Sequence, residues 1–130
     1  MIEDTSFIID LLHAEPAAVD YLELIEKSNR PEKISAVTVL ELYEAVPQLN
    51  VPKKRHQRIL DVLDTRQAVP ADETVMRKAG KISGELLARG KEINREDCVI
   101  AATALLADEP VVTRNVDHFS RINDLEVETY

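Results

Sequence analysis

Apolar positions along this chain follow two periods, one typical of strands and one typical of helices. Short apolar runs bounded by polar or turn-forming residues predict strands, and apolar residues recurring every three or four positions predict amphipathic helices. Strands are predicted from the N-terminus into Asp4 and at residues 33–37, 67–70, 110–113 and 125–129. Helices are predicted at residues 7–12, from Pro16 onward, and at 39–47, 53–64, 74–88 and 95–107.

The alternation of strands and helices predicts the class of fold. Strands separated by helices need crossover connections, which give a mostly parallel sheet of about five strands with helices on both faces. With 45% hydrophobic residues the chain can build one core, so we expect a single α/β domain over residues 1–130. Ligands of such open sheets bind beyond the carboxyl ends of the strands.

Charge narrows the classes of function without excluding nucleic acid. A net charge of −8 argues against a generic nucleic-acid binder, because phosphate binding draws its affinity from Lys and Arg. Bound divalent cations or a local basic cluster would reverse the potential where a polyanion docks, so an RNA substrate is still open. The acidic balance indicates either adaptation to a high-salt cytoplasm or an ordinary solvated surface.

The single cysteine and the N-terminus both favour a cytoplasmic protein. Cys98 lies in an apolar segment and has no partner for an intramolecular disulfide, which fits a reducing compartment. Glu3 and Asp4 stand where a signal peptide would carry basic residues, and no apolar run approaches the roughly 20 residues of a membrane span. We therefore expect a cytoplasmic protein without membrane contact.

Three acids interrupt apolar stretches, at Asp4, Glu41 and Asp97. Each has a structural interpretation, since Asp4 could cap a helix and both 38–41 and 94–97 resemble capping boxes. Their joint placement at strand ends or helix starts instead predicts convergence at the carboxyl end of the sheet. A pocket of carboxylates suits Mg²⁺, for which Mn²⁺ can substitute, because these hard cations prefer oxygen ligands.

The segment after the fourth predicted strand adds two candidate oxygen ligands, Asn115 and Asp117. Either residue would reach the end of the sheet where the three acids converge. Ordinary turn chemistry is the alternative interpretation of both, and the sequence does not decide between the two as a fourth ligand. Phe119 is predicted to be a core anchor.

Four ordered segments resemble the PIN-domain ribonucleases, in particular the toxins of VapBC toxin–antitoxin pairs. The resemblance is carried by Asp4-Thr5-Ser6, Ser35 to Leu42, Asp97 to Ala104, and Val112 to Asn115 with Phe119. It implies a PIN-like three-layer α/β/α sandwich, metal held by Asp4 and Asp97, and assistance from Glu41. It also implies a small cognate antitoxin and a homodimer. The fourth acid of the family is variably placed, so Asn115 and Asp117 compete for its role.

Phosphodiester hydrolysis is the chemistry that this resemblance implies, with RNA as the substrate. The catalytic candidates are Asp4, Glu41, Asp97 and Asp117, and the metal candidates are these four with Asn115. The hydroxyls of Ser6 and Thr113 would orient water or phosphate, or serve only as caps and turn-stabilising groups. We therefore expect a toxin that restrains growth by cleaving RNA. Which RNA it cleaves is not encoded in any residue pattern.

Two other functions compete with the ribonuclease. A Mg²⁺-binding receiver-like signalling module would be similarly small and acidic, but it needs a phosphoacceptor Asp at the end of the third strand and a Lys after the fifth, and neither is evident. A catalytically idle PIN-fold RNA-binding protein would keep the fold without the reaction. The intact acids favour an enzyme over that second alternative.

The densest basic run in the chain is the other feature with a bearing on RNA. Lys53, Lys54, Arg55 and Arg58 could contact RNA phosphates, although a solvated helix face is the more common meaning of such a run. The three histidines lack the spacing of a zinc motif, and no glycine-rich phosphate loop is present. These patterns argue against the common zinc and P-loop enzymes.

Overall fold

The protein is built on a five-stranded sheet in which every strand pairing is parallel. The computed structural model describes residues 1–130. The strand order is β3-β2-β1-β4-β5. The strands are β1 Ile2–Glu3, β2 Lys33–Ser35, β3 Gln67–Val69, β4 Val111–Val112 and β5 Val127–Glu128. The predicted sheet of about five mostly parallel strands is confirmed.

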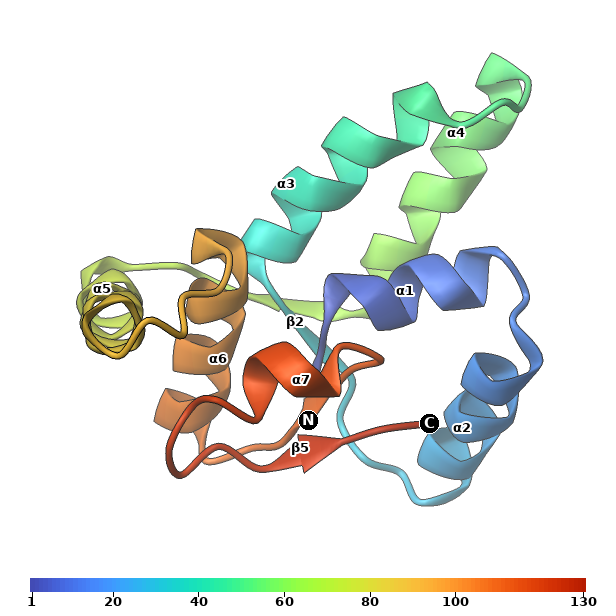
Figure 1. The fold of residues 1–130 in the computed structure, drawn as a ribbon. Helices are drawn as coiled ribbons and strands as arrows, with labels where there is room; N and C mark the ends of the chain where they lie inside the picture. The colour runs from blue at the N-terminus through green and yellow to red at the C-terminus, as the bar shows by residue number, and fades with distance from the viewer.

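Helices connect these strands and cover both faces of the sheet. They are α1 Thr5–Leu12, α2 Pro16–Lys27, α3 Ala36–Ala45, α4 Lys53–Leu60, α5 Glu73–Ala88, α6 Arg95–Ala107 and α7 Val116–Phe119. Two 3₁₀ turns, Val46–Gln48 and Asp61–Thr65, flank α4. Figure 1 shows α1 and α2 on one side of the sheet, α6 and then α5 on the other, and α3 with α4 projecting as an arm.

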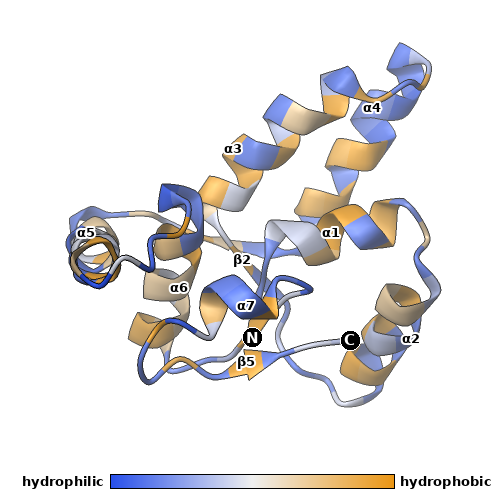
Figure 2. Cartoon of the chain, in the orientation of Figure 1, coloured by the Kyte–Doolittle hydropathy of each residue, from blue (hydrophilic) through white to orange (hydrophobic).

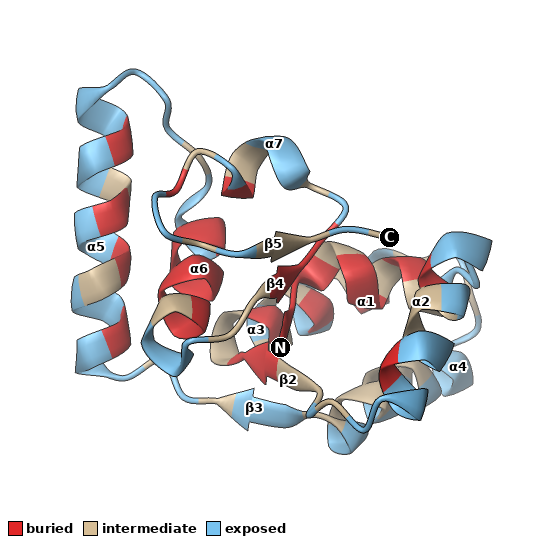
Figure 3. Cartoon of the chain, turned by 90° about the horizontal axis from the view of Figure 1, so that it is seen from below, coloured by how far each residue is buried: buried red, intermediate tan, exposed pale blue.

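Residue alternation along the strands explains why the core has two sides. Successive side chains of a strand point to opposite faces. Ile2 and Val111 therefore pack in the cluster that includes α5 and α6, whereas Met1 and Val112 pack in the cluster formed with α1 and α2. Helix α6 is the most deeply buried helix (Figure 3). The sandwich is thus the three-layer α/β/α arrangement predicted above.

The boundary between β2 and α3 differs from the sequence prediction. We predicted a strand over 33–37 and a helix from 39, but the strand ends at Ser35 and the helix begins at Ala36. The reason is local, because the Ser35 hydroxyl accepts a hydrogen bond from the backbone N–H of Val37 and caps the helix. The alternative interpretation of residues 38–41 as a capping box is therefore wrong, and Glu41 lies within the helix.

Two further elements differ from their predicted form. The helix predicted over 53–64 ends at Leu60 and continues as the 3₁₀ turn Asp61–Thr65. The segment after β4, predicted as a turn, contains the four-residue helix α7, which is too short to show a helical period in sequence. None of the helices combines the length and apolar character that a membrane crossing would need.

The end of the third strand bears on the receiver-like alternative. Asp72, the acid nearest that position, accepts a hydrogen bond of 3.0 Å from the backbone N–H of Val75 and is the N-cap of α5. A carboxylate used in this way stabilises a helix start rather than presenting a phosphoacceptor. This geometry removes the one residue that could have served the receiver interpretation.

Candidate active site

Three carboxylates from three separate elements lie beyond the carboxyl ends of the central strands, near enough to one another for their charges to interact. Asp4 follows β1 directly, Glu41 lies in α3, and Asp97 lies in the first turn of α6. Figure 1 shows the starts of α1, α3 and α6 gathered beside α7. The hydroxyl of Thr5, the residue after Asp4, donates to Glu41 Oε1 at 2.7 Å and so links α1 to α3. The predicted convergence at this edge is thus present in the fold.

None of the three acids acts as a side-chain helix cap. Asp4 is the N-cap residue of α1 by position, yet its side chain makes no capping hydrogen bond. Asn94 holds the N-cap position of α6, and its side chain makes no such bond either. Because Ser35 caps α3, the capping interpretation fails for all three acids. None of these carboxylates is therefore committed to capping a helix.

The hydrogen-bond partners of the two aspartates are hydroxyls and an imidazole. Asp4 is 4% exposed, and its Oδ2 accepts hydrogen bonds from Ser6 Oγ at 2.6 Å and from Thr113 Oγ1 at 2.7 Å. Asp97 is 8% exposed, and its Oδ2 lies 3.0 Å from His118 Nδ1. No Lys or Arg forms an ion pair with Asp4, Glu41 or Asp97. Buried carboxylates without a permanent cation are costly, so this edge of the sheet attracts positive charge.

The electrostatics of the site show that the acids influence one another. Burial is the main cause that raises the pKa of Glu41 to about 7; the charges of Asp4, Asp97 and Glu96 act in the same direction, and the hydrogen bond from Thr5 opposes them. Burial also raises the pKa of Asp97, a shift that the nearby charge of Asp4 reinforces and the hydrogen bond with His118 opposes. Shared negative potential of this kind favours binding of a cation or a proton.

The two candidates for a fourth ligand occupy different environments. The Asn115 amide nitrogen lies 2.8 Å from His118 Nδ1, the same atom that faces Asp97. The Asp117 side chain is 81% exposed and forms an ion pair of 2.7 Å with Arg121. The structure therefore brings Asn115 to the acids, and it does not bring Asp117 there. Phe119, predicted to be a core anchor, is fully buried.

Several residues at this site escaped the sequence analysis. His118 has no zinc-motif spacing with the other histidines, yet its ring contacts Asp97 across 21 positions of the chain. Thr5 and Thr38 hydrogen bond to each other at 3.1 Å beside Glu41. Glu96 adds negative charge next to Asp97. The sequence indicates only two of these residues as members of the site, Glu96 because it precedes Asp97 and His118 because it is close to Asn115.

The donor set fits a hydrated divalent cation better than a closed cage of protein ligands. No group of three or more Asp, Glu, His or Cys side chains lies close enough to hold a metal ion by itself. Mg²⁺ usually keeps several waters and takes only one or two carboxylates, and Mn²⁺ accepts the same oxygen donors. Asp4 and Asp97 could supply such carboxylates. Glu41 lies close enough to both that their charges raise its pKa.

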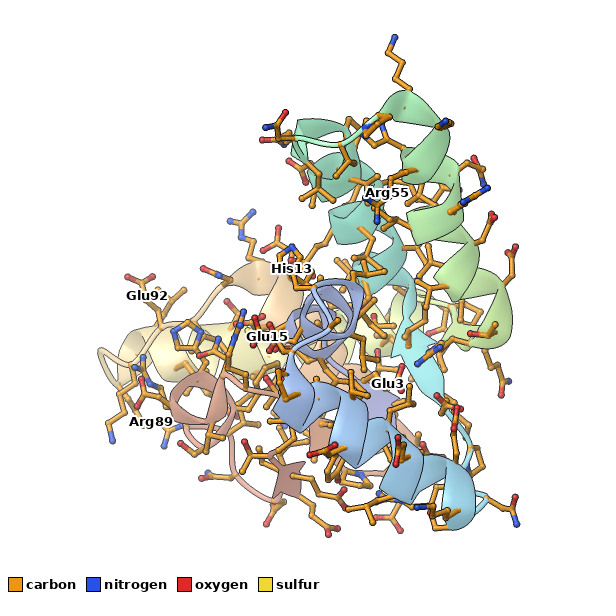
Figure 4. The ribbon with its side chains drawn as sticks, turned by 90° about the vertical axis from the view of Figure 1, so that its right-hand side faces the viewer. Glu3, His13, Glu15, Arg55, Arg89 and Glu92 are labelled. Carbon is orange, nitrogen blue, oxygen red and sulfur yellow. The ribbon has the colours of Figure 1, made fainter.

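The basic run forms a separate surface. Lys53, Lys54, Arg55 and Arg58 lie on α4, are exposed, and make no ion pair with the protein. Figure 2 shows α4 as one of the most hydrophilic helices, and Figure 4 shows Arg55 on the projecting arm. These cations therefore lie on the arm rather than among the acids.

Comparisons with known proteins agree in family and in fold. The model of the PIN domain family matches residues 1–125. The chain is 30% identical over 127 residues to ribonuclease VapC19 of Mycobacterium tuberculosis, covering 95% of this chain and 94% of the relative. It is 27% identical over 130 residues to ribonuclease VapC2 of Haemophilus influenzae, covering 98% of this chain and 95% of the relative.

Solved structures give the same picture at the level of the whole fold. VapBC2 from Rickettsia felis, bound to a DNA fragment from the promoter, superimposes with a TM-score of 0.87 and 26% identity over 99% of this chain and 97% of that one. FitAcB from Neisseria gonorrhoeae gives a TM-score of 0.80 and 28% identity over 97% and 94%. The likeness therefore extends over nearly the full length of each compared chain.

Proposed function

The chain belongs to the PIN-domain family, and from that premise we propose that it is a metal-dependent endoribonuclease and the toxin of a type II toxin–antitoxin pair. The observation that carries the proposal is the convergence of Asp4, Glu41 and Asp97, three carboxylates that cap no helix and pair with no Lys or Arg. The relatives named above are ribonucleases, and VapBC2, the neighbour with the TM-score of 0.87, is a complex bound to promoter DNA.

Each side chain of the site has a part that follows from its environment. Asp4 and Asp97 would hold Mg²⁺ or Mn²⁺, and the bound cation would supply an activated water at neutral pH and stabilise charge on the phosphate. Glu41, with a pKa of about 7, holds or releases a proton near neutral pH. Thr5 donates to Oε1 of Glu41, so the proton would reside on Oε2.

The surrounding residues keep these groups in place. Ser6 and Thr113 both donate to Oδ2 of Asp4, which fixes the orientation of that carboxylate. His118 does the same for Asp97, and Asn115 contacts the same ring nitrogen. We propose Asn115, rather than Asp117, as the further ligand or water-orienting group. Partners of this kind typically change metal affinity or activity by about 10–100-fold when removed.

Binding of RNA and of protein partners would use surfaces away from the acids. We propose that Lys53, Lys54, Arg55 and Arg58 contact RNA phosphates along the arm. Large apolar side chains remain exposed on the helices, at Leu24, Leu40, Tyr43, Met76 and Leu87. An antitoxin and a second copy of the chain are the partners that we propose cover them, in a cytoplasmic complex.

The test compares the wild-type protein with Asp97→Asn on total RNA and on synthetic single-stranded RNA, with Mn²⁺ or with EDTA. We expect cleavage only by the wild-type protein and only with Mn²⁺. The matched control is Glu26→Gln, which neutralises an exposed acid on α2 and should cleave as the wild-type protein does. Equal survival of RNA in every reaction would contradict the nuclease and would favour the idle RNA-binding alternative.

A measurement independent of activity tests the metal separately. A ligand that binds only the folded state stabilises it by about 2.7 kcal/mol at 100 times its Kd. Mn²⁺ should therefore raise the melting temperature of the wild-type protein, and it should have little effect on Asp4→Asn combined with Asp97→Asn. If both proteins respond equally, the cation binds elsewhere.

A further inference from the structure

A cavity lies where the loop between α1 and α2 meets the C-terminal residues. It has a volume of about 290 Å³ and is lined by Asp10, Glu15, Ala17, Arg114, Thr129 and Tyr130. This volume is just below the range of about 300–1,000 Å³ that is typical of small-molecule sites. Glu15, labelled in Figure 4, lies between α1 and α2 at its rim.

Arg114 is held in this cavity by a buried acid. Its Nη1 lies 2.5 Å from Asp10 Oδ1, and Asp10 is only 3% exposed. The hydroxyl of Tyr130 donates to the other oxygen, Oδ2, at 2.7 Å. Tyr130 is itself packed against Phe7, with ring centroids 4.9 Å apart. Both oxygens of Asp10 are therefore occupied, and one nitrogen of the Arg114 guanidinium is anchored on a buried carboxylate.

The backbone of Arg114 is tied to the acidic site. Its N–H donates to Ser6 Oγ at 3.4 Å, and that hydroxyl donates to Asp4. The preceding residue, Thr113, also donates to Asp4. Arg114 therefore begins at the site and extends into the neighbouring cavity.

The outward edge of the guanidinium is free. The Arg114 side chain is 60% exposed, and its Nε and Nη2 donate to no protein group. A guanidinium anchored on a carboxylate through Nη1 still presents the N–H groups of Nε and Nη2 to solvent, and their forked geometry suits a phosphate. In a chain with a net charge of −8, such a group beside carboxylates offers local attraction for a polyanion.

We propose that Arg114 and this cavity form a subsite for the nucleotide next to the scissile phosphate, in which the free edge of Arg114 binds the flanking phosphate. The subsite rests on the proposed ribonuclease function. Asp10 and Tyr130 are its positioning residues, because they hold the arginine in place. Glu15 lies at the rim, where its charge opposes the phosphate.

The experiment measures binding without cleavage. All variants carry Asp97→Asn, and a fluorescent single-stranded RNA of about 12 nucleotides is titrated at several KCl concentrations without divalent cations. Each phosphate contact contributes about 0.7 to the slope of log affinity against log salt for single strands. Arg114→Ala should lower that slope by about 0.7 and weaken binding by about tenfold at low salt.

Arg77→Ala is the matched control. Arg77 also makes an exposed ion pair, with Glu73 on α5, and has no contact with the acidic site. Arg77→Ala changes the net charge by the same amount as Arg114→Ala. Because Arg77 is not expected to contact the RNA, this variant should leave the salt slope unchanged. An equal change in both variants, or no change in Arg114→Ala, overturns the subsite.

Two further variants separate a phosphate contact from an effect on folding. Arg114→Lys keeps the positive charge and should keep the salt slope of the protein with Arg114. A lower salt slope in Arg114→Lys would contradict a phosphate contact. Glu15→Gln removes the opposing charge and should tighten binding by about twofold to threefold at low salt. Tighter binding would support the placement of the phosphate at this rim, and unchanged binding would contradict it. Melting temperatures identify any variant that is poorly folded.

Cleavage assays distinguish the failure of this inference from the failure of the proposed function. If the protein with an intact Asp97 cleaves RNA while Arg114→Ala leaves the salt slope unchanged, only the subsite is wrong. If that protein cleaves no RNA, the ribonuclease proposal fails, and with it the assignment of a scissile phosphate.

Discussion

Buried carboxylates occur in two regions of this fold, and only in one of them do they pair with an arginine. Glu3, which is fully buried, forms an ion pair of 2.9 Å with Arg66. Asp4 and Asp97 are nearly as buried but have only hydroxyls and an imidazole around them. In the first region an arginine of the protein compensates the negative charge, whereas in the second region no Lys or Arg does so.

The contrast is clearest at two neighbouring residues. Glu3 and Asp4 are adjacent in sequence, yet one belongs to each region, because Glu3 ends β1 and Asp4 begins the turn into α1. Burial alone therefore does not mark a functional acid. The informative feature is a buried carboxylate whose neighbours leave its charge uncompensated.

The largest expected effect is on the compensated region. Arg66→Met removes the partner of Glu3, whose pKa burial already raises despite the arginine. Breaking a buried pair in this way costs about 3–5 kcal/mol, because the remaining charge stays buried. Urea unfolding should show this loss of stability, which is a large part of the total for a domain of this size.

Two controls sharpen that prediction. Adding Glu3→Gln to Arg66→Met should recover part of the stability, because the fully buried carboxylate of Glu3 is then removed; Glu32, which pairs with Arg66 at 3.0 Å, is less buried and still loses its partner. Arg77→Met breaks an exposed pair and should change stability by less than about 1 kcal/mol. Equal losses in Arg66→Met and Arg77→Met would contradict the distinction between buried and exposed pairs.

A smaller effect is expected from pH in the uncompensated region. The pKa of Glu41 is about 7 in the folded protein and 4.5 ordinarily, so the folded state keeps a proton that the unfolded chain releases between those values. The contribution of Glu41 to the free energy of unfolding is thus present below pH 4.5 and lost as the pH rises through about 7. Without divalent cations, Glu41→Gln should remove this pH-dependent loss from the stability profile.

Glu26→Gln, which neutralises an exposed acid on α2, is the control for the pH experiment. Its profile, measured by urea unfolding at a series of pH values, should follow that of the wild-type protein. If the wild-type and Glu41→Gln profiles have the same slope from about pH 5 to about pH 7, Glu41 titrates normally and the prediction is wrong.

The smallest expected effect concerns Asp117, the acid that the fold leaves outside. Asp117→Asn should change stability by no more than about 0.5 kcal/mol, since the residue is exposed and paired only with Arg121. Its RNA cleavage should stay close to the wild-type rate, whereas Asn115→Ala should lose about 10–100-fold. A large loss of activity in Asp117→Asn would restore it as the fourth catalytic acid.

The sequence determined the order and type of the main elements and the identity of the three acids. Apolar periodicity located all five strands and six of the seven α-helices, because burial on one face leaves a regular pattern of residues. It misplaced the end of β2, since a single hydrogen bond to the Ser35 hydroxyl decided where α3 begins. It missed α7 because one turn of helix carries no period.

The tertiary structure alone decided which polar groups meet. His118 reaches Asp97 across 21 positions and Arg114 reaches Asp10 across 104, and no local pattern encodes either contact. The same is true of the surroundings of Asn115 and Asp117, because only the fold shows that Asn115 contacts His118 and that Asp117 is exposed and paired with Arg121. Local sequence sets periodicity and capping, whereas partners and compensation of charge depend on residues brought together only when the sheet and its helices pack.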